Sequence, residues 1–492
     1  MAPEQIGIRK ALTLSFAQRY ISLGLSVATI VIVSRLLTPA EIGVYSVAVG
    51  LIALVQMLRD FGVSDYVIQA RKLTDDMIST AFTVNLVIAW CLAAALFACS
   101  GWVGDFYHEP GAARVTRVVS LVLALLPFGS IRVCLMQRDL RYDKLMWIRL
   151  SETVARGLTT IGLAYAGFTY MSMAWAGVAG MATVVLGCVV WGRDYRIRGV
   201  SLAHWREVTH FGSNRTLSDL VTQAGEQSAN IVAGKLLGMS AAGFYSRGYG
   251  VVNLFRTNVI AAIQTVAIPA YAQEHREQNA APELFRKSLV YLTAICWPFF
   301  AFAILMAFPI MRIAFGHQWD AAVPLMRWLC GAAMVGTLIY YCNGFLIAIG
   351  EYRTVTRIEV CYQLVRIGIA VVAAFYGLEA LAASQVAVYA LAVVLYYRRL
   401  VRFPALRLRV LAAALIPSAV VTVAACVVPV VVVLMWSGSV RAHYLPAFVV
   451  TAVGSACGWL LALALTRHPF WYEVRRGIAT ATTRLVRRPA VR

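Results

Sequence analysis

The strongest constraint on this chain is a series of apolar runs, each about twenty residues long, that recurs along most of its length. A run of this length matches the bilayer core, where backbone groups find partners only inside a helix. Hydrophobic residues make up 60% of the 492 residues and charged residues only 14%, whereas soluble domains contain about 25% charged residues. The chain is therefore predicted to be an all-α integral membrane protein, and three soluble domains are excluded.

Fourteen such runs are predicted to be transmembrane helices. The first run is too long to be the apolar part of a signal peptide, so no cleavable signal is expected. The predicted spans are residues 13–34, 41–58, 79–99, 115–135, 148–166, 171–192, 213–234, 243–268, 288–308, 323–348, 358–376, 380–397, 410–435 and 444–466.

The basic residues predict the orientation. With the N-terminus in the cytoplasm, 30 of the 44 Lys and Arg residues fall on cytoplasmic segments or their edges and six on the opposite side. This is the positive-inside pattern, so both termini are expected in the cytoplasm. The basic tail is expected to rest on anionic lipid headgroups rather than on nucleic acid. Its arginines are Arg467, Arg475, Arg476, Arg484, Arg487, Arg488 and Arg492.

The chain also matches itself at an offset of about 200 residues. Gly43, Tyr45, Ser46 and Gly50 correspond to Gly243, Tyr245, Ser246 and Gly250, and further along the offset becomes 210. Spans 1–6 and 7–12 are thus predicted to be parallel repeats around a central cavity. The expected divisions are an N-terminal lobe (1–200), a C-terminal lobe (201–400), accessory spans 13 and 14 (401–466) and a cytoplasmic tail (467–492).

Polar residues that recur on one face of a span predict a water-filled cavity, because charges facing lipid are costly. In span 7 they recur every three or four residues from Arg215 through Asp219 and Glu226 to Asn230. A static Arg215–Asp219 pair is the alternative, although it leaves Glu226 uncompensated. The planar guanidinium of arginine suits phosphate, which predicts that Arg19, Arg215, Arg247 and Arg256 face an anionic group.

The remaining polar residues of the spans receive other predicted roles. Gln18, Gln223, Asn230, Tyr249 and Asn253 are expected to line the cavity. Asp219 and Glu226 are candidates for coupling, either by sensing protons or by balancing the charge of the arginines. Glu152 with Arg156, and Glu359 with Arg366, are possible cavity residues or structural pairs.

Several chemistries are not supported by the sequence. The G-x-x-x-x-G-K-[ST] motif of ATPases is absent, the seven histidines lie in loops or at span ends, and the ten cysteines form no C-x-x-C motif. No cofactor and no metal site is therefore expected. The loops outside the cytoplasm are too short for a catalytic domain, which argues against a membrane enzyme of glycan assembly.

Several motifs resemble those of Wzx-type polysaccharide transporters in the multidrug/oligosaccharidyl-lipid/polysaccharide exporter superfamily, in the branch of colanic-acid-type exporters. These are Ser34-Arg-Leu-Leu-Thr-Pro-Ala-Glu-Ile-Gly-Val-Tyr45, Asp60-Phe-Gly-Val-Ser64, Gln137-Arg-Asp-Leu-Arg-Tyr142, Gly234-Lys-Leu-Leu-Gly238 and Phe315-Gly-His-Gln-Trp319. The resemblance covers residues 10–400. It departs from the family's pattern before Asn230, where an acidic residue is expected but Ala229 stands.

The resemblance implies two six-helix lobes and a transporter, not an enzyme. It implies a flippase that moves undecaprenyl-diphosphate-linked oligosaccharide across the bacterial inner membrane for exopolysaccharide or O-antigen synthesis, with polymerase and chain-length proteins as possible partners. On this resemblance, Arg19, Arg215, Arg247 and Arg256 are expected to bind the diphosphate, and the cavity-lining residues above are expected to contact sugars. An ion-coupled exporter of small organic cations on the same fold is the alternative. Spans 1, 7 and 8 hold four of the arginines above against Asp219 and Glu226, and this net positive charge disfavours a cation exporter.

Overall fold

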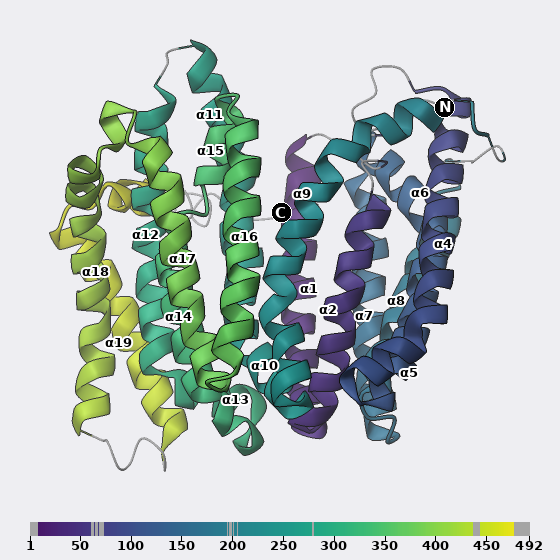
Figure 1. Ribbon diagram of the computed structural model, residues 1–492. Helices are drawn as coiled ribbons and strands as arrows, with labels where there is room; N and C mark the ends of the chain where they lie inside the picture. The colour runs from purple at the N-terminus through teal and green to yellow at the C-terminus, as the bar shows by residue number, and fades with distance from the viewer. Residues whose placement is uncertain are drawn as a thin grey trace, which may run out of the picture. The chain divides into compact units, whose positions relative to one another are not determined.

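The computed structural model describes residues 8–60, 63, 67, 73–193, 195, 199, 201–203, 205–277, 280–435 and 443–476; within these ranges, the side chains of 8–16, 60, 206–218 and 262 are not described. The described secondary structure is helical throughout, as predicted, and no strand occurs in it (Figure 1). Contacts divide the chain into two compact units, Met1–Ser246 and Arg247–Arg492.

The described part of the first unit contains eight complete α-helices, a π-helix and the start of α10. Its second helix, α2, packs against α5 and α9, and α7 packs between α1 and α8. Because α9 packs on α2, the first unit continues beyond residue 200, where the sequence places the boundary between lobes. The elements are α1 (Ile8–Leu36), α2 (Pro39–Asp60), α4 (Asp75–Tyr107), α5 (Pro110–Leu125), α6 (Pro127–Arg138), α7 (Tyr142–Tyr165), α8 (Met171–Trp191), α9 (Trp205–Val232) and η1 (Ala233–Leu237).

The second unit begins within α10 (Met239–Phe255). In it, α12 packs against α14 and α18, and α17 packs against α14 and α16. The other elements are η2 (Arg256–Ile260), α11 (Ala261–Glu277), α12 (Ala281–Leu305), α13 (Ala307–Phe315), η3 (His317–Ala322), α14 (Val323–Gly336), α15 (Cys342–Ala348), α16 (Tyr352–Ala374), α17 (Leu378–Leu400), η4 (Pro404–Leu406), α18 (Leu408–Met435) and α19 (Tyr444–Leu465).

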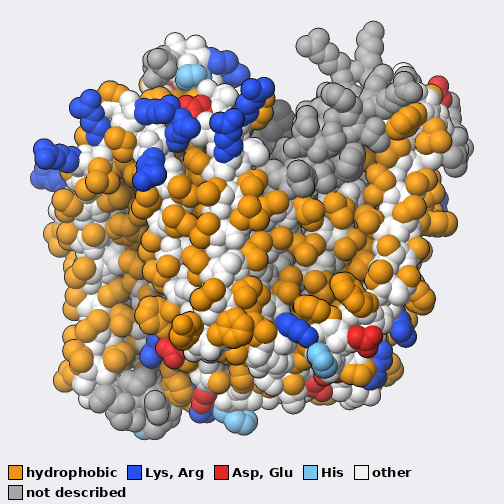
Figure 2. Space-filling view, in the orientation of Figure 1, with side chains coloured by type: hydrophobic (Ala, Val, Ile, Leu, Met, Phe, Trp, Pro, Cys, Tyr) orange, Lys and Arg blue, Asp and Glu red, His pale blue; other side chains and the backbone are white. Residues whose placement is uncertain are grey.

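Eight of the described helices are long and apolar enough to cross a membrane, or ten if each of two bent pairs is one span. Each of the fourteen predicted spans falls on a helix or on consecutive helices. The other predicted spans do not meet this requirement of length and apolar character. The helix is either broken, as at α14–α15, or carries charged residues, as in α7, α9 and α16. Hydrophobic side chains cover the flanks in Figure 2, whereas Lys and Arg side chains gather at the ends.

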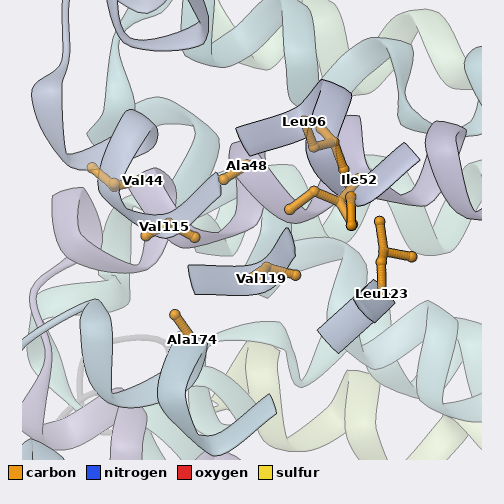
Figure 3. Packing of buried hydrophobic residues seen from close by; sticks show 9 residues of the cluster. Val44, Ala48, Ile52, Leu96, Val115, Val119, Leu123 and Ala174 are labelled. Atoms are coloured by element: carbon orange, nitrogen blue, oxygen red, sulfur yellow. The ribbon is translucent and has the colours of Figure 1, made fainter. Parts of the chain in front are cut away.

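One hydrophobic core cluster of the first unit consists of small and branched side chains from α2, α4, α5 and α8. Figure 3 shows Val44, Ala48 and Ile52 of α2 facing Leu96, Val115, Val119, Leu123 and Ala174. The α2 residues recur at intervals of four, so they form one stripe along the helix. Small side chains in this stripe let neighbouring helices approach closely, as is usual in membrane bundles.

Two glycines bring the starts of α2 and α10 into backbone contact. A Cβ added to Gly43 would lie 1.7 Å from the Met239 carbonyl oxygen, and one added to Gly243 would lie 2.0 Å from that of Pro39. The contact is therefore reciprocal, with each glycine facing the residue four positions before the other. Only glycine fits at either position, since a side chain would meet backbone that cannot rotate away.

A polar cluster joins the last two helices to α12. The buried His468 ring accepts a hydrogen bond at Nδ1 from the Phe470 amide (3.1 Å), so its Nε2–H donates to Ser418 of α18 (3.1 Å). Ser418 Oγ also donates to the Val290 carbonyl of α12 (3.3 Å) and accepts from Thr293 (3.0 Å). The cluster thus fixes the tautomer of His468 and the position of α18 against α12.

We expect this cluster to make the protein less stable in acid. Burial lowers the pKa of His468 from its ordinary value of 6.5. The unfolded chain then binds the proton more readily, so stability is present above pH 6.5 and is lost below it, by at most about 1.4 kcal/mol per pH unit. Melting of the purified protein between pH 7.5 and 5 measures this loss. His468→Gln should remove part of the acid-induced fall, whereas His317→Gln, at an exposed position, should retain all of it; an unchanged fall in His468→Gln contradicts the assignment.

Candidate functional site

In the first unit, the predicted site residues lie along the packed helices α1 and α7. Gln18 donates to Ser22 (3.1 Å), and Thr153 of α7 donates to the same hydroxyl (3.3 Å). The half-buried Arg19 lies next to Gln18 in α1. Glu152 and Arg156 form an ion pair at 2.7 Å, with side-chain exposures of 17% and 56%. A polar strip therefore runs along this helix pair.

The polar face of α9 is described only in part. The side chain of Arg215 lies outside the described residues; Asp219 is exposed, and Gln223 and Glu226 are half-buried. Asn230 contacts α2, because its Nδ2 donates to the Ser46 carbonyl (3.0 Å). A residue expected to contact sugar thus has a protein partner in this conformation, on the same face of α2 that carries Gly43.

In the second unit, aromatic rings fix one of the predicted arginines. The Arg247 guanidinium lies 5.9 Å from the Phe315 ring centroid and 5.8 Å from that of Trp319. The loop that carries these rings is held by a bidentate bond from Arg312 to Asp320 (2.6 and 2.8 Å). A guanidinium over aromatic faces keeps its charge at little conformational cost, so Arg247 is pre-oriented.

The second arginine, Arg256, begins the π-helix η2 and donates to Asn253 (3.5 Å). The span bends by 46° where η2 passes into α11. Short π-helical segments are frequent at functional sites because they shift side chains out of the regular helical register. Tyr249 lies two turns earlier and is half-buried, like Arg256 and Asn253.

The third cluster of the second unit is buried between α16 and α17. Arg366 is 3% exposed; its Nε donates to Gln385 (3.1 Å), and its guanidinium lies 5.7 Å from the Tyr389 ring centroid. Glu359 accepts from the Tyr396 hydroxyl (2.5 Å). Gln385 was not among the predicted residues, and its only signal in the sequence is an amide within an apolar span.

No group of three His, Cys, Asp or Glu side chains that could hold a metal ion occurs in the described part of the chain. The ten cysteines are free thiols. The arrangement consequently offers cationic and hydrogen-bonding groups for binding, with arginines pre-oriented by rings, amides and a π-helix. Of the tail arginines, Arg467, Arg475 and Arg476 are exposed, and Arg484, Arg487, Arg488 and Arg492 lie outside the described residues.

The fold is similar to the folds of two solved membrane proteins. A structure of the lipid II flippase MurJ, in an inward closed conformation, matches with a TM-score of 0.73 over 92% of this chain and 99% of that chain, at 12% identity. An inward-facing multidrug resistance MATE family transporter of the MOP superfamily matches with a TM-score of 0.61 over 79% and 94%, at 16% identity. These likenesses confirm the all-helical membrane fold.

The chain belongs to the family described as Polysaccharide biosynthesis protein, whose match covers residues 32–324. It is similar to the lipopolysaccharide biosynthesis protein WzxC of Escherichia coli K12 (24% identical, 63% of each chain). It is also similar to the succinoglycan biosynthesis transport protein ExoT of Rhizobium meliloti (25% identical, 66% of this chain and 65% of that one). The matches thus span just under two thirds of these relatives' length, and they confirm the resemblance drawn from the motifs.

Proposed function

We propose that this protein is a flippase for undecaprenyl-diphosphate-linked oligosaccharides in the bacterial inner membrane. The observation that carries the proposal is the combination of a polysaccharide-biosynthesis family match with the fold of a lipid II flippase over nearly the whole chain. Both point to a sugar carried on a lipid diphosphate. Enzymes of polysaccharide synthesis are the partners proposed from the family.

We propose fourteen spans with cytoplasmic termini and two parallel repeats. The reciprocal Gly43–Gly243 contact supports the repeat, because the two glycines are 200 residues apart and occupy equivalent places. The interrupted spans support it as well: α5 and α6 meet at residue 126, and α14 and α15 are separated at 337–341, which agrees with the offset of 210. Interrupted helices in transporter repeats often mark the binding region.

The diphosphate is proposed to bind through Arg19, Arg215, Arg247 and Arg256 as access alternates across the membrane. The pre-oriented Arg247 and the position of Arg256 at the start of η2 support this, since a fixed guanidinium loses little freedom when it binds phosphate. Asp219 and Glu226 stay candidates for coupling. Asn230 is proposed to exchange its bond to Ser46 for a sugar hydroxyl when α2 and α9 separate.

Transport in proteoliposomes tests the proposal. The substrate is a fluorescent polyprenyl-diphosphate oligosaccharide, and the measurement is the initial rate at which its sugar becomes accessible to an added lectin. Arg256→Gln should lower the rate about tenfold or more, because a charge-assisted hydrogen bond contributes roughly 1.5–3 kcal/mol. Arg409→Gln, at an exposed position early in α18, should leave it unchanged.

The same vesicles separate this function from that of a cation exporter. If empty vesicles expose the sugar as fast as vesicles with the protein, or if Arg256→Gln transports at the wild-type rate, the proposed site is wrong. Uptake of ethidium driven by a proton or sodium gradient, without movement of the lipid-linked sugar, would instead support the exporter alternative.

A further inference from the structure

The break in the tenth predicted span is an irregular segment in the second unit. Between α14 and α15, residues 337–341 leave the α-helix, and the Leu338 and Ile339 amides bond to carbonyls three residues back. The backbone carbonyl of Tyr340 accepts a hydrogen bond from the side-chain amide of Gln264 (2.6 Å). Irregular backbone at membrane depth is tolerated only where protein or a cavity satisfies it, and here α11 supplies the partner.

This bond ties the break to the span that carries Arg256. Gln264 lies in α11, one helical turn after η2, so the bent span that begins at α10 both presents Arg256 and holds Tyr340 in place. The Tyr340 phenol interacts electrostatically with Tyr389, Tyr249 and Arg256. Two helix irregularities, a π-helix and a break, therefore bring their polar side chains to the same part of the unit.

The hydroxyl of Tyr340 is buried and has no hydrogen-bond partner. A Cβ on Gly336 would lie 3.4 Å from this hydroxyl and 3.2 Å from the Tyr389 ring, so the phenol lies against the backbone of α14 beside Tyr389. Burying an unpartnered hydroxyl is unfavourable, and such groups in native proteins call for an explanation. A ligand that supplies the missing acceptor would be one.

We propose that Tyr340 is a substrate-binding residue whose hydroxyl donates a hydrogen bond to a phosphate oxygen held by Arg256. The inference rests on the proposed function and adds a neutral donor from a different helix to its cationic site. An anionic oxygen fits better than a sugar hydroxyl because the neighbouring guanidinium attracts charge and the phenol donates most strongly to an anion. In this proposal, the hydroxyl gains its hydrogen-bond partner only when the lipid diphosphate binds.

The adjacent tyrosine provides a matched control. Tyr341 is 1% exposed, and its hydroxyl also has no hydrogen-bond partner. The groups that interact electrostatically with its phenol are Tyr271 and Cys296. Tyr340→Phe and Tyr341→Phe each delete one buried, unpartnered oxygen at neighbouring positions, so a general effect of such a deletion should appear in both.

The test compares these two variants with Arg256→Gln and the double variant in the proteoliposome assay. Tyr340→Phe should slow flipping three- to tenfold while its melting temperature stays equal to or above that of the wild type. Tyr341→Phe should flip at the wild-type rate. The double variant should be little slower than Arg256→Gln alone, because both groups hold one phosphate.

Three results would overturn the proposal: a wild-type rate for Tyr340→Phe, an equal loss in Tyr341→Phe, or a lowered melting temperature of Tyr340→Phe. A binding measurement separates this failure from failure of the proposed function. Undecaprenyl diphosphate, but not undecaprenol, should raise the melting temperature of the wild type, and Tyr340→Phe should lose much of that shift. If the diphosphate stabilises the wild type and Tyr340→Phe alike, Tyr340 is not a ligand-binding residue while the proposed function stands.

Discussion

Gly243→Ala is expected to reduce folded protein severely, although it adds one methyl group. The new Cβ would lie 2.0 Å from the Pro39 carbonyl oxygen, and α2 and α10 would have to move apart by more than an ångström. Forced overpacking of this kind costs about 3 kcal/mol or more when the obstacle is backbone. Fluorescence-detected gel filtration and melting in detergent measure the yield and stability.

The same helix contains a control. A Cβ on Gly250 meets no atom within 4 Å, so Gly250→Ala should retain wild-type yield and stability, or gain slightly from the better helix propensity of alanine. Gly43→Ala should be as harmful as Gly243→Ala because the contact is reciprocal. Wild-type melting for Gly43→Ala or Gly243→Ala would show that the helices do not meet in this way.

Arg366→Ala is the second change expected to have a large effect. The substitution leaves a cavity between α16 and α17. It also deprives the side-chain oxygen of Gln385, Oε1, of the hydrogen bond from Arg366 Nε. Together a cavity and an unpaired buried acceptor cost roughly 3–5 kcal/mol. The free energy of unfolding, obtained by titration with SDS in mixed micelles, should fall by about this amount.

Two further variants check the cause of that loss. Arg357→Ala lies on the exposed face of the same helix and should change stability by less than about 0.5 kcal/mol. Arg366→Ala combined with Gln385→Leu removes the unpaired carbonyl and fills space, and should recover part of the loss. If the double variant is as unstable as the sum of its parts, the two residues do not act together.

The course of the helices could be predicted from the sequence to a large extent, but their interruptions could not. Each predicted apolar run falls on helix, because hydropathy over twenty residues reports burial in lipid directly. Pro127 begins α6 and is a local sequence signal for the bend between α5 and α6. The break at 337–341 has no proline, and it depends on Gln264 from another helix.

The candidate site shows the same division. The sequence predicts which arginines lie in spans, since charge stands out against an apolar background. It cannot pair side chains across helices, so neither the bond from Arg366 to Gln385 nor the aromatic rings beside Arg247 could be foreseen. Asn230 was predicted from the helical face it occupies, and its contact with Ser46 depends on how closely α2 and α9 approach.

The cluster around His468 also bears on the order of synthesis. Ser418 meets Thr293, which is made 125 residues earlier, and His468, which is made 50 residues later. The polar cluster therefore cannot be completed until the chain around Phe470, whose amide bonds to His468, has left the ribosome. Until that moment the Ser418 hydroxyl lacks its bond to His468, so nascent chains that stop before His468 should hold α18 less firmly against α12.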